Sequence, residues 1–283
     1  MPTSEEIKAN QATIWSHASP AWAEWDATWE RFPGPVNEWL CAAADLKPGM
    51  NVLDLASGAG QPAVAVAARV APGGKVTATD IAPGMVDMLR QRIERAGIAN
   101  LEAVVMDMEK LEFPDESFDA VTARWAFMFA PDAVGAIAAA RRVLKPGGRL
   151  ATATWDKADQ NWWQGAQIFE KTLNPLVPPP PPDPNAPNPL RFSDPELLEQ
   201  MLRDAGFADV SSETVPFRFD FGSSDEWWRF ISTVNAPVAA RLRRLDAAQL
   251  DQVRQESTAE IERFASGDRL ALAAACLCAV GRK

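Results

Sequence analysis

Short apolar runs alternate with stretches of helical composition through the middle of the chain. The apolar runs cover residues 50–57, 75–81, 101–107, 117–127 and 149–155. The intervening residues 62–71, 83–97 and 131–144 have the composition or the amphipathic pattern of helices. Strand signals that alternate with helices in this way predict a Rossmann-like, doubly wound and mostly parallel α/β sheet with right-handed crossovers.

The N-terminal region follows a different pattern. Residues 1–48 have helical composition, so they predict a helical segment ahead of the sheet. Ser4 stands before two acidic residues and is the expected N-cap of the first helix. Because proline interrupts helices, Pro20, Pro33 and Pro35 are expected to divide this segment into pieces.

The alternation becomes irregular after the fifth predicted strand. Residues 157–173 look helical and lead into a proline-rich stretch, residues 175–189. A capped helix over 193–207 and an alternating strand over 209–221 follow. Residues 269–283 fit a closing strand, which gives a seven-stranded sheet, although periodicity alone leaves a buried helix open.

The chain is expected to divide into six parts. They are a helical N-terminal cap (1–48), a Rossmann-like core (49–156), a cap insertion with the proline-rich stretch (157–192), a core helix and strand (193–221), a helical cap insertion (222–268) and a closing core strand (269–283). The two insertions are expected to cover a site at the strand ends.

Composition and charge narrow the choice of partners. The 283 residues include 38 acidic and 28 basic side chains, and the net charge of −10 disfavours a nucleic-acid partner. Cys41, Cys276 and Cys278 lack the spacing of a metal site or a disulfide framework. No apolar stretch reaches the roughly 18 residues of a membrane span, and the N-terminus is polar. We therefore expect a protein without a membrane span, in a reducing, cytoplasmic setting.

His17 is the single histidine of the chain. A metal site built on two histidines is therefore excluded, and no metal site is expected. A Ser-His-Asp triad would have to use His17.

The segment from Asp54 to Gly60 carries the clearest chemistry. Glycines directly after a strand let a ligand approach the backbone, and the following helix offers free N–H groups. The sequence also satisfies the G-x-G-x-x-G/A pattern of dinucleotide sites, with Asp80 placed as the acid for a ribose. Two residues disfavour a pyrophosphate, because Pro62 lacks an N–H group and Asp54 would repel a dianion. The Asp54 carboxylate would instead attract a ligand that carries an ammonium or a sulfonium.

Four segments of the predicted core resemble the motifs of class I S-adenosylmethionine-dependent methyltransferases. VLDLASGAGQPA resembles the first motif, TATDIAPGMVDML the second, and VVMDMEKLEFPDESFDAV the adenine-binding segment. RRVLKPGGRL resembles the helix-to-strand turn of the ubiquinone/menaquinone-biosynthesis-type branch (methyltransferase domain 11/25). Asp54, Asp80 and Asp107 are spaced 26 or 27 residues apart, which is one strand and one helix per step.

The resemblance implies S-adenosyl-L-methionine as the cofactor. Asp80 would hold the ribose hydroxyls, and Asp107 would accept from the exocyclic amine of adenine, a role that Glu109 could share. The cofactor-binding residues that we expect are Asp54, Ala56, Ser57, Gly58, Gly60, Gln61, Asp80, Ile81, Met85, Asp107, Met108, Glu109, Arg124 and Trp125.

The acceptor side is indicated by aromatic residues. The chain has 11 tryptophans and no tyrosine, and aromatic faces bind both flat apolar molecules and cations. The substrate-pocket residues that we expect are Trp15, His17, Trp22, Trp155, Trp162, Trp163, Trp227 and Trp228. Several of these tryptophans are equally consistent with residues that anchor helices in a core.

Methyl transfer from a sulfonium is a direct displacement that depends on alignment and on the exclusion of water. A base is needed only when the acceptor must lose a proton. His17, Asp26, Asp156 and Glu170 are candidate bases, and no catalytic residue is assigned.

The favoured function is methyl transfer to oxygen, nitrogen or carbon of a small, largely apolar metabolite. Two alternatives stay open. One is a nicotinamide-dependent oxidoreductase, and the other is an S-adenosylmethionine-binding protein without transferase activity.

Overall fold

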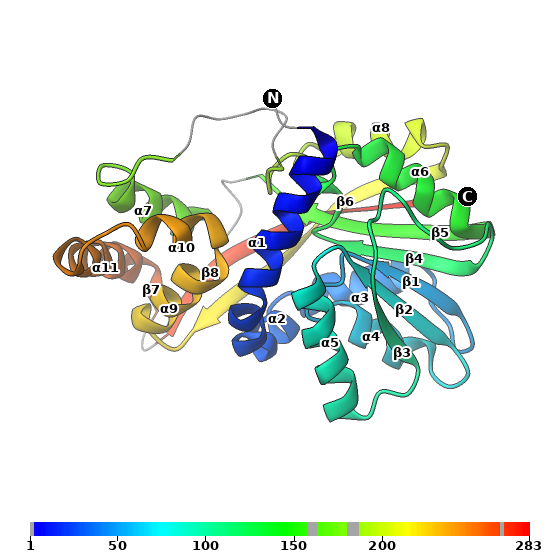
Figure 1. Cartoon of the computed structure of the whole chain (residues 1–283), viewed down its shortest axis with the longest axis horizontal. Helices are drawn as coiled ribbons and strands as arrows, with labels where there is room; N and C mark the ends of the chain where they lie inside the picture. The colour runs from blue at the N-terminus through cyan, green and yellow to red at the C-terminus, as the bar shows by residue number, and fades with distance from the viewer. Residues whose placement is uncertain (1–2, 158–162, 180–186, 267–268) are drawn as a thin grey trace.

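The computed structural model describes residues 3–157, 163–179, 187–266 and 269–283 (Figure 1). A central sheet follows the order β3-β2-β1-β4-β5-β8-β6, and the short strand β7 pairs with β8. The strands are β1 (Asn51–Leu55), β2 (Lys75–Asp80), β3 (Leu101–Val105), β4 (Phe118–Arg124), β5 (Leu144–Trp155), β6 (Ala208–Phe221), β7 (Ala265–Ser266) and β8 (Arg269–Arg282). Neighbours from β3 to β5 are parallel, whereas β8 runs antiparallel to both β5 and β6. The predicted Rossmann-like, mostly parallel sheet is confirmed.

Helices lie on both faces of the sheet and beyond one of its ends. They are α1 (Ser4–Glu24), α2 (Asp26–Arg31), α3 (Gly34–Ala43), α4 (Ala63–Val70), α5 (Pro83–Ala96), α6 (Ala133–Val143), α7 (Trp163–Leu173), α8 (Pro195–Asp204), α9 (Ser224–Val234), α10 (Ala236–Leu242) and α11 (Ala247–Ile261), with short 3-10 turns at Phe127–Phe129 and Glu262–Phe264. Figure 1 shows β6 and β8 extending out of the sheet toward the group formed by α7 and α9–α11, with α1 between that group and the parallel strands.

The parallel strands are buried because helices cover both of their faces. In β1, all four residues from Val52 to Leu55 are inaccessible to solvent. The helix of the second motif, α5, ends where Gly97 takes the left-handed conformation (φ 64°) that terminates many helices. Residues 269–282, for which periodicity left two interpretations open, form a strand because they pair along both edges with β5 and β6.

The first helix begins one residue earlier than the sequence suggested. Thr3, not Ser4, is the N-cap, and its side chain accepts from the Glu6 amide while the Glu6 carboxylate accepts from the Thr3 amide. This reciprocal capping box satisfies two free donors, which Ser4 could not do without a glutamate or glutamine three residues later. The expected N-cap at Ser4 is therefore wrong.

Pro20 lies inside α1 rather than at a break. Proline has no N–H to donate to the carbonyl of Ser16, and the hydroxyl of Ser19 donates to that oxygen instead (2.9 Å). The helix therefore continues to Glu24, and the expected break at Pro20 is wrong. Pro33 and Pro35 do mark a boundary, since they lie at the start of α3.

Candidate functional site

A cavity of about 1170 Å³ opens at the carboxyl ends of the parallel strands. One end is lined by the glycine loop, by the residues after β2 and β3, and by the end of β4. The rest of the lining comes from α1, which reaches along the cavity from the loop end, from Asp26 and Trp29 of α2, and from residues between 232 and 243 in α9 and α10. The carboxyl edge of an open α/β sheet is where such folds bind their ligands.

The glycine loop presents backbone rather than side chains to the cavity. Ala56, Gly58 and Gly60 all have left-handed φ angles of 51°, 52° and 114°. A Cβ on Gly60 would lie 2.6 Å from Cδ1 of Leu89, whereas a Cβ on Gly58 would meet nothing within 4 Å. The space beside Gly58 is therefore open for a ligand, and the space beside Gly60 is needed by α5.

Asp80 ends β2 directly beside this loop. Its Oδ2 accepts from the amide of Gly58 (2.9 Å) and its Oδ1 from the amide of Ala82 (2.8 Å). Burial raises the pKa of Asp80 to about 6, and these two hydrogen bonds oppose that rise. Asp80 lines the cavity, so its carboxylate is available to accept hydrogen bonds from a ligand.

Asp54 lies beneath the glycine loop and is inaccessible to solvent. Its Oδ1 accepts from the hydroxyl of Thr122 (2.5 Å), and its Oδ2 has no hydrogen-bond partner among the described residues. Burial raises the pKa of Asp54 to about 6. Asp54 does not line the cavity, so any attraction it exerts on a bound cation acts from below the loop. Its direct contact with the cofactor stays a prediction.

Two acids and a lysine meet after β3. Asp107 Oδ2 lies 2.8 Å and Glu109 Oε2 lies 3.2 Å from Nζ of Lys8 on α1. All three residues line the cavity, and Lys8 is 6% exposed. Lys8 was not expected at this site, because it lies 99 residues away from Asp107 along the chain and no motif includes it.

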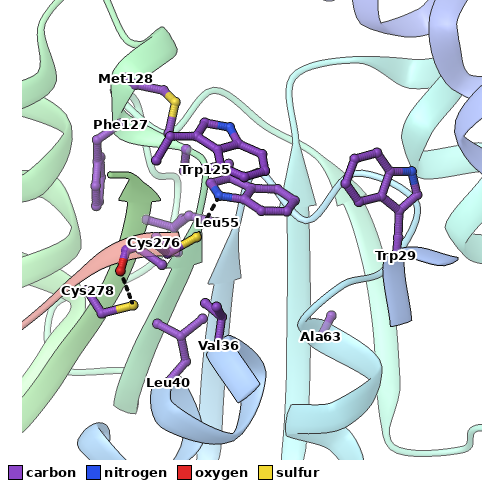
Figure 2. Packing of buried hydrophobic residues seen from close by; sticks show 14 of the residues in the cluster. Trp29, Val36, Leu40, Leu55, Ala63, Trp125, Phe127, Met128, Cys276 and Cys278 are labelled. Carbon is purple, nitrogen blue, oxygen red and sulfur yellow. Dashed lines mark hydrogen bonds between the residues drawn. The ribbon is translucent and has the colours of Figure 1, made fainter. Parts of the chain in front are cut away.

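Arg124 is the last residue of β4, and Trp125 follows it directly. The Arg124 guanidinium lies over the Trp125 ring (4.3 Å to the centroid), and its Nη1 donates to Oδ1 of Asn37 (2.8 Å). Burial lowers the pKa of Arg124 to about 10. Trp125 has a φ of 55°, an uncommon backbone conformation for a bulky residue. It stacks on Trp155 (4.3 Å, 11°), and Figure 2 shows its Nε1 donating to Sγ of Cys276 (3.2 Å).

A second stacked pair extends the first into an aromatic wall, which consists of Trp22, Trp29, Trp125 and Trp155. Trp22 and Trp29 are parallel at 4.4 Å, and Trp29 packs against Trp125 in a T-shaped arrangement at 5.6 Å. Trp15 packs against Trp22 and Phe129. Of these residues, Trp29 and Phe129 line the cavity but were not expected from the sequence. The ring of Trp125, whose backbone has the uncommon φ angle, is packed between Trp29 and Trp155. Uncommon backbone conformations of this kind are often found at functional sites.

Most other predicted site residues also line the cavity. They are Ala56, Ser57, Gly58, Gly60, Gln61, Ile81, Met85, Met108, Trp15, His17, Trp22 and Trp155. Trp227 and Trp228 do not line it, since both pack against Phe169 (6.4 and 5.1 Å) and Trp227 is inaccessible to solvent. Trp162 and the side chain of Trp163 fall outside the described part of the chain.

The candidate bases differ in their surroundings. His17 is exposed on α1 and lines the cavity, as does Glu170. Asp26 also lines it but is paired with Arg92 (2.5 Å). Asp156 is buried away from the cavity, where it accepts from the hydroxyl of Thr214 (2.7 Å).

Within residues 3–157, 163–179, 187–266 and 269–283, no three His, Cys, Asp or Glu residues are grouped closely enough to hold a metal ion. No helix in the same ranges has the length and apolar character needed to cross a membrane.

The sheet order and the glycine loop define a Rossmann-like α/β domain, with acids at the end of β2 and after β3 lining its cavity. Residues 53–152 match the family model described as "Methyltransferase domain". This part of the chain is therefore similar to methyltransferase domains, and its likeness is to the ubiquinone/menaquinone-biosynthesis type.

Two curated relatives illustrate that likeness. The ubiquinone/menaquinone biosynthesis C-methyltransferase UbiE of Bordetella avium is 44% identical over 107 residues, which are 38% of this chain and 41% of that protein. The aklanonic acid methyltransferase DauC of Streptomyces sp. (strain C5) is 38% identical over 117 residues, which are 41% of this chain and 53% of that protein. The chain spans about half the length of the curated relatives that it matches.

Known structures show the same fold over most of the chain. The partner of the Trm112 methyltransferase activator in a complex from Haloferax volcanii has a TM-score of 0.55 at 20% identity, covering 98% of this chain and 97% of that one. The YcgJ protein from Bacillus subtilis has a TM-score of 0.54 at 18% identity, covering 87% and 97%. At these identities the likeness concerns the fold alone.

Proposed function

We propose that this protein binds S-adenosyl-L-methionine and transfers its methyl group to oxygen, nitrogen or carbon of a small, largely apolar metabolite. One observation carries the proposal: a single cavity joins the glycine loop, Asp80 at the end of β2 and the acids after β3 to a wall of stacked tryptophans. Its volume of about 1170 Å³ is above the roughly 300–1,000 Å³ of ordinary small-molecule sites, so it has room for a cofactor and an acceptor.

The residues at the loop end fit this cofactor. Asp80 offers carboxylate oxygens for ribose hydroxyls, and Asp107 offers an acceptor for the amine of adenine. The open space beside Gly58 lets the amino-acid part approach the backbone. Oδ2 of Asp54, which has no hydrogen-bond partner in the described part of the chain, lies beneath the loop, where negative charge favours an ammonium or a sulfonium.

The remaining residues would align the acceptor and exclude water. When bound, S-adenosylmethionine supplies a methyl group that its sulfonium has already activated. Trp125 and Trp155 form a rigid, stacked wall on which a flat acceptor can lie. We propose that α1 and the insertions that hold α7 and α9–α11 act as the cap over this wall, which keeps water from the reacting atoms.

The same features disfavour a bound pyrophosphate. Pro62 is the N-cap of α4 and has no N–H to offer, and the buried Asp54 carboxylate would oppose a dianion at the loop. The alternative of a nicotinamide-dependent oxidoreductase is therefore less favoured. The other alternative, a protein that binds S-adenosylmethionine without transferring its methyl group, can be distinguished from an enzyme only by measuring turnover.

Calorimetric titration tests the cofactor. We expect S-adenosylmethionine and S-adenosylhomocysteine to bind at micromolar concentrations, while NADH shows no binding. Binding of NADH without binding of S-adenosylmethionine would overturn the proposal. Turnover is then tested by the release of S-adenosylhomocysteine with a panel of quinols, polyketides and terpenoid-like compounds, and a panel that gives no release above the background favours the non-catalytic alternative.

We also propose that the protein works in a reducing, cytoplasmic compartment. Cys41, Cys276 and Cys278 are all buried as free thiols. The net charge of −10 favours a small molecule over a nucleic acid as its partner.

A further inference from the structure

Lys8 is a buried cation on the helix that covers the cofactor end of the cavity. Its Nζ contacts Asp107 Oδ2 (2.8 Å), Glu5 Oε1 (2.9 Å) and Glu109 Oε2 (3.2 Å). Burial alone would lower the pKa of Lys8, but the hydrogen bonds to Asp107, Glu5 and Glu109 hold it above its ordinary value. Lys8 is therefore charged, and its charge is balanced mainly by acids outside its own helix.

The two acids after β3 depend on Lys8 in turn. The Asp107 side chain is 20% exposed and that of Glu109 is 12% exposed, so neither is well screened by water. Asp107 Oδ1 accepts from the Glu109 amide (2.9 Å), and Glu109 Oε1 accepts from the Asp132 amide (2.9 Å). Lys8 thus contacts both neighbouring carboxylates, and its positive charge offsets the repulsion between them.

Helix α1 also contacts the domain at a second position, the start of α5. The amide of Gly84, at the start of α5, donates to Oγ of Ser16 (3.2 Å). A Cβ on Gly84 would lie 2.8 Å from the carbonyl oxygen of Ser16, so the two helices touch through backbone. The position of Lys8 over the two acids is therefore set by a close helix contact, not by a flexible side chain alone.

We propose that Lys8 is a positioning residue of the nucleoside site, which holds the Asp107 carboxylate in place to accept from the exocyclic amine of adenine. This inference rests on the proposed cofactor. It makes recognition of the base depend on α1, which lies outside the segment that matches the family model. Its consequence is selectivity: loss of Lys8 should weaken the binding of an adenine nucleoside more than that of one without the amine.

The test is calorimetric titration of the full chain with S-adenosylhomocysteine and with S-inosylhomocysteine, which carries a carbonyl in place of the amine. We expect the wild type to prefer the adenine compound. In Lys8→Met, binding of S-adenosylhomocysteine should weaken about 10-fold or more, while binding of S-inosylhomocysteine changes by less than about 3-fold. Lys8→Arg, which keeps the charge, should restore most of the preference.

Lys110→Met is the matched control. Lys110 follows the same acids in sequence, but its side chain is 64% exposed and it pairs with Glu5 instead. It should bind both compounds as the wild type does. If Lys8→Met does not fold, Lys8→Gln takes its place with the same expected change in preference.

Two outcomes would overturn the inference. Equal weakening of both compounds in Lys8→Met would mean that Lys8 only fastens α1, and unchanged binding would mean that it does neither. Failure of the proposed function is seen separately, because the wild type would then bind neither compound.

Discussion

The carboxylate of Asp80 accepts a hydrogen bond from the amide of Gly58 across 2.9 Å, and this bond ties the end of β2 to the glycine loop. A second bond, from the amide of Ala82, fixes the other oxygen. The carboxylate is therefore oriented before a ligand arrives, and little entropy is lost when it accepts further hydrogen bonds. Substitution of Asp80 is therefore the most direct test of the proposed cofactor site.

Asp80→Ala should weaken the binding of S-adenosylhomocysteine about 10- to 100-fold, because charge-assisted hydrogen bonds to the ribose are lost. The protein should remain folded, since burial makes the ionised carboxylate costly to keep. Calorimetry gives the dissociation constant, and thermal unfolding checks the fold. Asp87→Ala, which removes an exposed acid from the neighbouring α5, is the control and should bind as the wild type does. An unchanged dissociation constant in Asp80→Ala would refute the assignment.

Asp54 makes stability depend on pH. Its pKa is raised from 3.8 to about 6 in the folded protein, because burial disfavours the charged form. The folded state therefore binds a proton more tightly than the unfolded state, and this group's cost to stability is fully present above pH 6 and disappears as the pH falls toward 4. Asp54→Asn should raise the free energy of unfolding by about 1–3 kcal/mol at pH 7.5 and by much less at pH 4.

Urea unfolding at the two pH values measures this change. The amide oxygen of an asparagine can still accept from Thr122, so the existing hydrogen bond is kept. Asp87→Asn, on the surface, should show no such difference between the two pH values. A loss of stability in Asp54→Asn at pH 7.5 would contradict the account of Asp54 as a costly buried charge.

The sheet could be predicted because its signals are local. Each parallel strand is a short apolar run between glycines or polar residues, and burial on both faces requires that composition. The closing strand is different, because only its pairing with β5 and β6 decides between strand and helix. At the N-terminus the N-cap also has a local signal, because Glu6 stands three residues after Thr3 with the spacing of a capping box, whereas Ser4 has no such partner.

The candidate site could be predicted only where motifs carry it. The glycine loop, Asp80 and the acids after β3 all lie at the carboxyl ends of parallel strands, so their meeting at one edge follows from the fold. Lys8 and Asn37 reach the site from helices that precede the first strand, and no spacing in the sequence reveals such contacts. The sequence also does not reveal which tryptophans face the site, since Trp22 on α1 lines the cavity and Trp227 on α9 is buried away from it.

A substitution at Trp227 therefore tests whether a tryptophan that is buried away from the cavity contributes to stability without contributing to cofactor binding. Trp227→Ala should lower the free energy of unfolding by about 3–5 kcal/mol, because a large, fully buried ring is removed. At a temperature where the variant remains folded, its dissociation constant for S-adenosylhomocysteine should stay within about 3-fold of the wild type. Trp39→Ala is the control for truncation of a partly exposed tryptophan and should cost much less stability. A large loss of affinity in Trp227→Ala would place this ring in the site after all.

Substitution of His17 tests whether this residue acts as a general base for acceptors that must lose a proton. It is the chain's single histidine, and from an exposed position on α1 it lines the same cavity as the tryptophans that would hold an acceptor. With an acceptor that must lose a proton, such as a phenol, His17→Ala should lower kcat about 10²-fold, because general-base catalysis commonly contributes this much.

The dissociation constant for S-adenosylhomocysteine should not change in His17→Ala. Gln11→Ala, a change on the same helix that also lines the cavity but carries no titratable group, should leave kcat within a few-fold of the wild type. Single-turnover measurements separate the chemical step from product release. If kcat falls equally for an acceptor that is already nucleophilic, His17 aligns the acceptor instead of removing its proton, and a kcat near the wild-type value with a phenol assigns it neither role.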